Sequence, residues 1–127
     1  MRKLTAILCL TLAVLLGSPG VSESADFQKG WTAYQSGDYA TALREWKPLA
    51  EQGNALAQFA LGWMYENGQG VPQDNVYAHM WWNIAASSGD KDAVKNRDIV
   101  AEKMTPSQIA DAQKLARECV RKKYKGC

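Results

Sequence analysis

From residue 25 onward, apolar positions recur every three or four residues, and no stretch shows sustained alternation of apolar and polar residues. The first spacing places apolar side chains on one face of an α-helix, whereas half-buried strands need the second. The pattern predicts an all-α chain with helices at residues 25–35, 39–52, 55–66 and 75–87, a fifth that Asp90 caps and that runs through Lys103, and a sixth from Pro106.

Two of these helices have the same design. At an offset of 36 residues, one series of positions falls on another: Asp38, Ala42, Trp46, Ala50 and Gly53 on Asp74, Ala78, Trp82, Ala86 and Gly89. The spacing of four marks one helix face, and the glycine stands where a C-terminal cap belongs. Upstream, Tyr34 and Gly37 fall on Tyr65 and Gly68 at an offset of 31. A helix–turn–helix unit that repeats in this way predicts an α/α solenoid of about two and a half to three helix pairs.

Local signals refine the helices. Pro48 lies inside the helix at 39–52 and removes a backbone donor, so we expect a kink there. In the string from Met104 to Gln108, Thr105 is the expected N-cap, Pro106 the first helical residue and Gln108 the capping-box partner. Residues 90–127 are read as a degenerate third pair whose charged last helix forms the C-terminal cap of the solenoid.

The first 24 residues have the layout of a secretory signal peptide. Arg2 and Lys3 precede an apolar run at 4–16, and small or turn-forming residues follow it. The run is shorter than the roughly 20 apolar residues that span a bilayer. We expect cleavage before Ala25, with Val21 as the alternative site and an uncleaved anchor as the other interpretation. One domain at 25–127 then remains, with repeats at about 25–53 and 54–89 and the degenerate pair at 90–127.

Residues 54–89, NALAQFALGWMYENGQGVPQDNVYAHMWWNIAASSG, closely resemble a Sel1-like repeat, whose pattern is roughly AxAQxxLGxxYxxGxGVxxD followed by AxxWxxxAAxxG. The matching residues are Ala55, Ala57, Gln58, Leu61, Gly62, Tyr65, Gly68, Gly70, Val71, Asp74, Ala78, Trp81, Ala85, Ala86 and Gly89. The preceding segment resembles a hybrid of this repeat and the tetratricopeptide repeat. The resemblance implies that the protein serves protein–protein interaction and complex assembly.

The charge balance and the cysteines bear on which ligands and which compartment the chain suits. The chain has 15 basic and 13 acidic residues, and without Arg2, Lys3 and Glu23 it has 13 and 12. This near-neutral balance gives no argument for nucleic acid or for membrane insertion after cleavage. One basic cluster, at Arg117, Arg121, Lys122, Lys123 and Lys125, fits a helix C-terminus, and a basic docking patch is the alternative. In an exported chain, Cys119 and Cys127 are expected to form a disulfide rather than a metal site or a nucleophile.

The glycine-rich stretch at 61–74 does not match a phosphate-binding loop, because no lysine follows and a helix leads into it. Gly62 is expected to let a neighbouring helix approach, Gly68 and Gly70 to adopt positive φ, and Asp74 to cap the next helix. We therefore expect neither a cofactor nor a metal.

Signals for catalysis are weak. Ser88 and Lys91 have the SxxK spacing of penicillin-binding enzymes but lack the downstream SDN and KTG motifs. His79 has no serine or cysteine placed as its partner and is expected to be solvated or partly packed. Some cysteine-rich secreted Sel1-like relatives carry cysteines eight residues apart, as Cys119 and Cys127 are, and this resemblance implies a β-lactamase-like or penicillin-binding enzyme as the alternative.

A candidate partner-binding surface comes from the tryptophans. Most of the five are expected in the core, at Trp46, Trp81 and Trp82, whereas Trp63 and Met64 stand at variable positions of the repeat. Leu56, Ala60 and Trp63 are spaced as one helix stripe, which predicts a protein- or peptide-binding groove; the alternative is that the stripe packs on another helix pair. We expect a non-catalytic scaffold or adaptor in the periplasm or outside the cell, with the enzyme or a secreted effector as alternatives.

Overall fold

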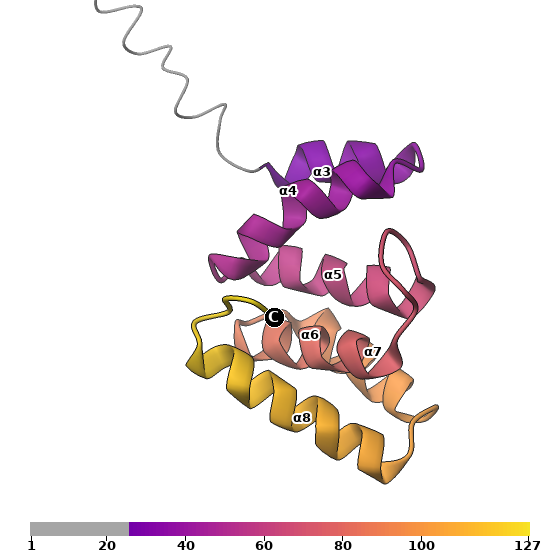
Figure 1. Cartoon of the computed structure of the whole chain (residues 1–127), viewed down its shortest axis with the longest axis vertical. Helices are drawn as coiled ribbons and strands as arrows, with labels where there is room; N and C mark the ends of the chain where they lie inside the picture. Colours follow the sequence, from indigo (N-terminus) through magenta and orange to yellow (C-terminus); the bar gives the residue numbers. More distant parts are fainter. Residues whose placement is uncertain (1–25) are drawn as a thin grey trace, which may run out of the picture.

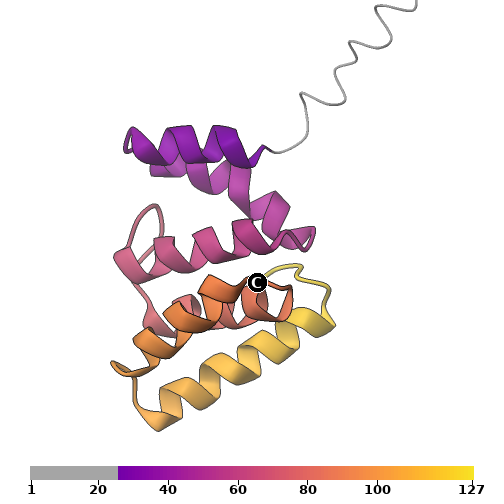
Figure 2. The same cartoon turned by 180° about the vertical axis from the view of Figure 1, so that it is seen from behind.

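The computed structural model describes residues 26–127, and all the regular structure in this range is helical. The helices are α3 (Phe27–Gln35), α4 (Tyr39–Glu51), α5 (Ala55–Asn67), α6 (Asn75–Ser87), α7 (Lys91–Ala101) and α8 (Pro106–Arg121). They stack as consecutive pairs, α3–α4, α5–α6 and α7–α8, with α4, α6 and α8 toward the viewer in Figure 1 and α3, α5 and α7 toward the viewer in Figure 2. The predicted all-α array of helix pairs is confirmed. The predictions for residues 1–24 lie outside the described residues.

Three turns between helices share one hydrogen-bond pattern. Each helix is followed by a cap residue and then by a glycine with positive φ, at Gly37, Gly53 and Gly89. The next N–H donates back into the last helical turn, as Asn54 N does to the Leu49 carbonyl at 3.0 Å, which makes a Schellman motif. The same residue then caps the next helix, since Asn54 Oδ1 accepts from the Ala57 N–H. A Gly-Asn or Gly-Asp dipeptide therefore ends one helix and starts the next.

The predicted helix boundaries differ from the structure by one residue at the ends of α4 and α5 and by two residues at two other places. α3 begins at Phe27 rather than at 25, because the Asp26 carboxylate accepts a hydrogen bond from the Gln28 N–H and caps the helix there. α7 ends at Ala101 rather than at Lys103, because Lys103 N donates to the Val100 carbonyl in a tighter turn. The capping box at the start of α8 forms as predicted between Thr105 and Gln108. Pro48 lies within α4, whose ribbon changes direction in both views (Figures 1 and 2).

The core is divided into two clusters along the stack. The first lies among α3, α4, α5, α6 and α8 around Trp46, Leu61 and Trp81, and the second lies among α5, α6, α7 and α8 around Trp82 and Val100. Trp46, Trp81 and Trp82 are all buried, in line with the sequence. Since one helix pair cannot bury its apolar face alone, each cluster is completed by a neighbouring pair.

The expectation for His79 was wrong. Its side chain is buried, with 3% of its surface exposed, and Nδ1 has no hydrogen-bond partner within the described residues. Burial, and then the nearby Arg97 charge, lower the pKa of His79, while Asp98 acts in the opposite direction. The sequence pattern missed this because α7, which supplies Arg97 and Asp98, packs against the α6 face that an isolated α5–α6 pair would expose to solvent.

The chain after α8 turns back toward the middle of the molecule (Figure 1) and is held there by the predicted disulfide between Cys119 and Cys127. This tail, residues 122–127, starts with another Schellman turn in which Lys123, with φ of 57°, takes the position that glycine takes elsewhere. Tyr124 then packs over Gly53 in the turn between α4 and α5. The disulfide and this contact thus hold two non-glycine residues, Lys123 and Tyr124, in the left-handed region, which costs about 1–2 kcal/mol for each.

Within residues 26–127, no helix combines the length and the apolar character that a membrane span requires. In the same part of the chain, no group of three or more His, Cys, Asp or Glu side chains is arranged to hold a metal ion.

Candidate protein-binding groove

A five-residue motif, FxxGW, occurs in both α3 and α5, as Phe27–Trp31 and as Phe59–Trp63. In each copy, a tryptophan of the following helix lies flat against the glycine: Trp46 against Gly30, and Trp82 against Gly62. A Cβ atom on either glycine would collide with the indole ring.

Both indoles are also hydrogen bonded to the motif. Trp46 Nε1 donates to the Phe27 carbonyl at 3.1 Å, and Trp82 Nε1 donates to the Phe59 carbonyl at 3.0 Å. A buried indole N–H needs such a partner. Each helix pair is thus fastened by the same glycine, tryptophan and carbonyl.

The two copies of the motif are 32 residues apart. The internal repeats found from the sequence were 36 and 31 residues apart, so this motif was missed. Two copies of FxxGW within 37 residues were the signal that could have revealed it. The motif matters for the site because it directs one tryptophan of each pair into the core and leaves the motif's own tryptophan, Trp31 or Trp63, on the outer face of its helix.

A groove of about 340 Å³ opens between α3 and α5, on the face that Figure 2 presents. We call it the α3–α5 groove, and it is lined by Phe27, Gln28, Trp31, Trp46, Leu56, Phe59, Ala60 and Trp63. α3 packs closely on α4, and α4 on α5, but α3 and α5 do not form a closely packed pair. The gap between them is therefore filled only in part, by aromatic side chains.

The structure brings three of the four predicted binding residues together. Leu56 is 49% exposed, Trp63 is half-buried, and Ala60 forms part of the buried floor. Met64 does not join them, because its side chain is fully buried in the first core cluster, next to Gly70. One residue along a helix turns the side chain by about 100°, and this rotation carries Met64 away from the groove and into the core.

Trp63 also packs on the first pair, as the alternative interpretation had it. Its ring centroid lies 6.5 Å from that of Tyr34 and 5.1 Å from that of Phe59. The ring thus contacts both walls while one part of it stays open to solvent. Sequence reasoning missed the α3 wall, formed by Phe27, Gln28 and Trp31, because it considered the stripe on α5 alone.

The chemistry of the groove is apolar and aromatic, and Gln28 is the polar side chain among its lining residues. Such a surface binds by burying an apolar side chain, with tryptophan as a frequent source of binding energy. The remaining repeat positions shape the fold around it. Gly68 and Gly70 have φ of 66° and 77°, and the Asp74 carboxylate accepts hydrogen bonds from the N–H groups of Val76 and Tyr77.

The SxxK residues lie at the junction of α6 and α7. Ser88 is the C-cap of α6 and donates from Oγ to Gln58 Oε1 at 3.1 Å, while Gln58 Nε2 donates to the Ala50 carbonyl. The Ser88 hydroxyl therefore belongs to a hydrogen-bond chain that joins α6, α5 and α4. Lys91 begins α7 with its side chain exposed.

Comparison with known proteins adds to this geometry. The Sel1 repeat model matches residues 55–90, which are α5, α6 and the turn after them. The chain is 35% identical over 88 residues, or 69% of its length, to a chitin synthase regulator, SKT5, of Malassezia restricta. It is 33% identical over 63 residues, or 50% of its length, to an exopolysaccharide production negative regulator of Rhizobium leguminosarum bv. viciae.

The aligned parts are small in both relatives, at 5% of the length of the fungal protein and 24% of that of the rhizobial protein. The likeness therefore concerns the repeat and not either protein as a whole. Together with the helix pairs, it shows that residues 55–90 of this chain are a Sel1 repeat.

Proposed function

We propose that this protein is a non-catalytic adaptor that binds an apolar segment of a partner protein in the α3–α5 groove. The observation that carries this proposal is the exposure of Leu56 beside the half-buried Trp31 and Trp63. A large aliphatic side chain that is about half exposed beside two aromatic rings offers apolar area to a partner at little ordering cost.

The comparisons support a role of this kind. Both relatives are named as regulators, which fits a protein that acts by binding other proteins. We further propose that the protein acts in the periplasm or outside the cell, on the basis of the signal-like residues 1–24 and the cysteine pair. N-terminal sequencing of the exported form, with Ala25 as the expected first residue, tests this location.

Photocrosslinking tests the groove. A benzophenone amino acid at position 56 should crosslink a defined partner, and a benzophenone at position 99, equally exposed on α7, should not. With the purified partner, Leu56→Asp should weaken binding at least tenfold, because it places a charge where apolar area is buried.

The matched control for Leu56→Asp is Ile99→Asp, which places the same charge at a residue of similar exposure on α7, outside the groove. Both variants should keep the helical circular dichroism and the unfolding temperature of the wild type. Equal loss of binding in both variants would contradict the assignment to the groove. Turnover of nitrocefin that Ser88→Ala abolishes would contradict the non-catalytic role.

A further inference from the structure

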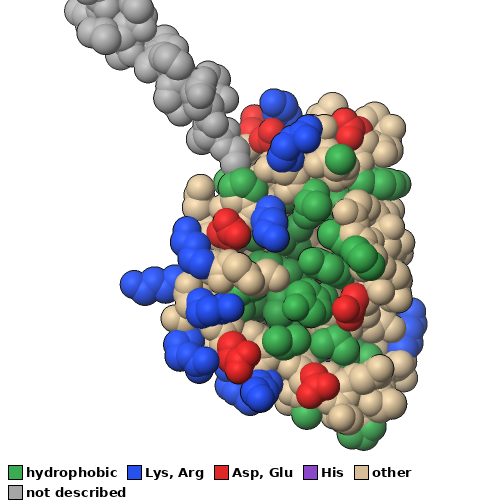
Figure 3. All heavy atoms as spheres, in the orientation of Figure 1, with side chains coloured by type: hydrophobic (Ala, Val, Ile, Leu, Met, Phe, Trp, Pro, Cys, Tyr) green, Lys and Arg blue, Asp and Glu red, His purple; other side chains and the backbone are tan. Residues whose placement is uncertain are grey.

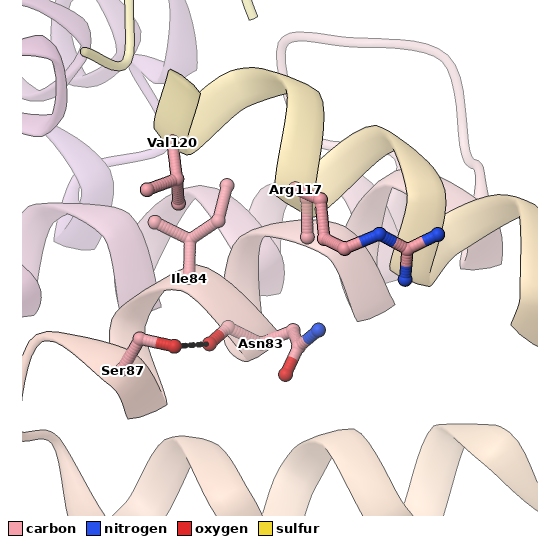
Figure 4. A pocket seen from close by; sticks show the side chains of 6 residues that line it. Asn83, Ile84, Ser87, Arg117 and Val120 are labelled. Carbon is pink, nitrogen blue, oxygen red and sulfur yellow. Dashed lines mark hydrogen bonds between the residues drawn. The ribbon is translucent and has the colours of Figure 1, made fainter. Parts of the chain in front are cut away.

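A second recess lies at the other end of the stack, between α6 and α8. α7 and α8 each pack mainly against α6, and they meet each other through side chains of the second core cluster. The α6–α8 pocket occupies about 240 Å³ and is lined by Asn83, Ile84, Ser87, Ala116, Arg117 and Val120 (Figure 4). It shares no lining residue with the α3–α5 groove.

One side of this pocket offers hydrogen-bond donors. Arg97 of α7 donates from Nη1 to Asn83 Oδ1 at 3.1 Å, which fixes the Asn83 amide with its oxygen toward α7. The Asn83 NH₂ group has no hydrogen bond to another residue within 26–127, and neither has the exposed Arg117 guanidinium. The Asn83 amide and the Arg117 guanidinium can both donate hydrogen bonds, and a carboxylate is a suitable acceptor for such a pair.

The other side of the pocket is aliphatic. Ile84, Ala116 and Val120 form it, and Val120 is 46% exposed. No aromatic ring lines the recess, so it lacks the stacking platform on which bases bind. A ligand that fits both sides carries a short aliphatic group next to an acidic one.

The surface around the pocket is basic. Lys114, Arg117 and Arg121 follow one another at i, i+3 and i+7 on α8, all exposed, and Lys122, Lys123 and Lys125 continue into the tail. Among residues 114–125, Glu118 is the acidic residue; it lies one turn from Lys114 and Arg121 and about 100° away from Arg117. Figure 3 shows Lys and Arg side chains gathered along the edge where α8 ends.

A favourable interaction with the helix dipole accounts for only part of this charge. The dipole effect is limited to the last turn of a helix, and Arg121 lies in that turn. Lys114 and Arg117 lie earlier in α8, so the dipole does not account for their charges. We call Lys114, Arg117 and Arg121 the basic stripe.

We propose that the α6–α8 pocket and the basic stripe form a second docking site, for an acidic peptide segment of a partner protein. An aliphatic side chain of that segment occupies the space beside Ile84 and Val120, and flanking carboxylates pair with Arg117 and the basic stripe. Charge complementarity selects the acidic segment, and the aliphatic wall selects a peptide over a purely polar polyanion. The protein then holds two different partner segments at two ends of one short stack.

Residue-resolved NMR tests this site. The isotope-labelled protein is titrated with three peptides, Ac-EELEEL-NH₂, Ac-EESEES-NH₂ and Ac-KKLKKL-NH₂. The first should shift the amide signals of Asn83, Ser87, Ala116 and Val120 in a saturable manner, and its affinity should fall as salt is raised. Serine in place of leucine should weaken binding about tenfold, and the lysine peptide should not shift these signals.

Two variants probe the two sides of the pocket. Arg117→Glu should lower the affinity for the acidic peptide at least tenfold. Arg44→Glu makes the same charge change at an exposed residue of α4 and should change this affinity by no more than about twofold. Val120→Ser should reduce the advantage of leucine over serine in the peptide. All three residues are exposed, so unchanged unfolding temperatures are expected and serve as the folding control.

Several outcomes would overturn the proposal. One is the absence of saturable shifts, and another is an equal response to the leucine and serine peptides. Stronger binding of the same residues to polyuronate or to anionic lipid vesicles would assign the basic stripe to a polysaccharide or a membrane instead. Shifts confined to Leu56, Phe59 and Trp63 would place the peptide in the α3–α5 groove, which separates failure of this proposal from failure of the proposed function.

Discussion

The first two helix pairs and the third pair are held together in different ways. In α3–α4 and α5–α6, a glycine without a Cβ atom lets a buried tryptophan lie against the helix backbone and donate a hydrogen bond to it. Residues 91–121 contain neither glycine nor tryptophan, and α7 and α8 both pack mainly on α6. The comparison shows that the first two pairs share one glycine–tryptophan contact, which the third pair cannot make.

The two candidate sites also differ in their chemistry. The FxxGW motif leaves Trp31 and Trp63 outside the closed pairs, where they line an apolar groove. The recess between α6 and α8 has polar and cationic edges instead. Repeats of one family thus present two chemically different surfaces within 102 described residues, 26–127.

The largest expected effect comes from substitutions at the glycine–tryptophan contacts in α3–α4 and α5–α6. Gly62→Val places side-chain atoms where the Trp82 indole lies and should lower the free energy of unfolding by about 3 kcal/mol, because neither backbone nor ring can move freely. Gly30→Val should do the same through Trp46. Ala110→Val, at an exposed position of α8, is the control and should cost about 0.5 kcal/mol. Urea denaturation measures all three, and a loss below 1 kcal/mol at Gly62 would show that the indole is not the constraint.

Removal of the disulfide tests what holds the tail against the end of α8. The double variant Cys119→Ser with Cys127→Ser should lose up to about 2.5 kcal/mol, the loop-closure entropy for a separation of eight residues. The effect should be local: hydrogen exchange should become faster at Tyr124 and in the last turn of α8, and stay unchanged in α5. Equal acceleration throughout the chain would show that the tail supports the whole stack.

The capping box tests whether α8 depends on local signals. Thr105→Ala removes the hydroxyl that accepts from the Gln108 N–H and should cost about 1 kcal/mol. Thr105→Ser keeps the hydroxyl and should be nearly neutral. Thermal unfolding measures both variants, and equal unfolding temperatures would contradict a structural role for the cap.

The smallest expected effect concerns pH. Burial lowers the pKa of His79 in the folded protein, whereas the unfolded chain has the ordinary value of 6.5. The unfolded state therefore binds the proton first as pH falls, so His79 takes stability away below about pH 6.5 and has no such effect above it. His79→Gln should flatten the decline in unfolding free energy between pH 7 and pH 5. A slope identical to that of the wild type would assign the decline to other groups.

Much of the fold could be predicted because its signals are local. The bounds of α6 follow from Asp74 and the apolar spacing, and the start of α8 follows from Thr105, Pro106 and Gln108. The candidate groove was only partly predictable. Leu56, Ala60 and Trp63 follow from the periodicity of α5, but their opposite wall, Phe27, Gln28 and Trp31, depends on how α3 stands against α5.

By itself, the sequence determined the helices, their pairing and the link between Cys119 and Cys127, because caps, glycines and apolar periodicity act over a few residues. Only the tertiary structure decided that Met64 is core, that His79 is buried under α7, and that α7 and α8 both pack mainly on α6. Those outcomes depend on contacts between helices, where side-chain volume and the space left by a neighbour decide the arrangement. Periodicity along one helix gives the direction of each side chain but not what lies opposite it.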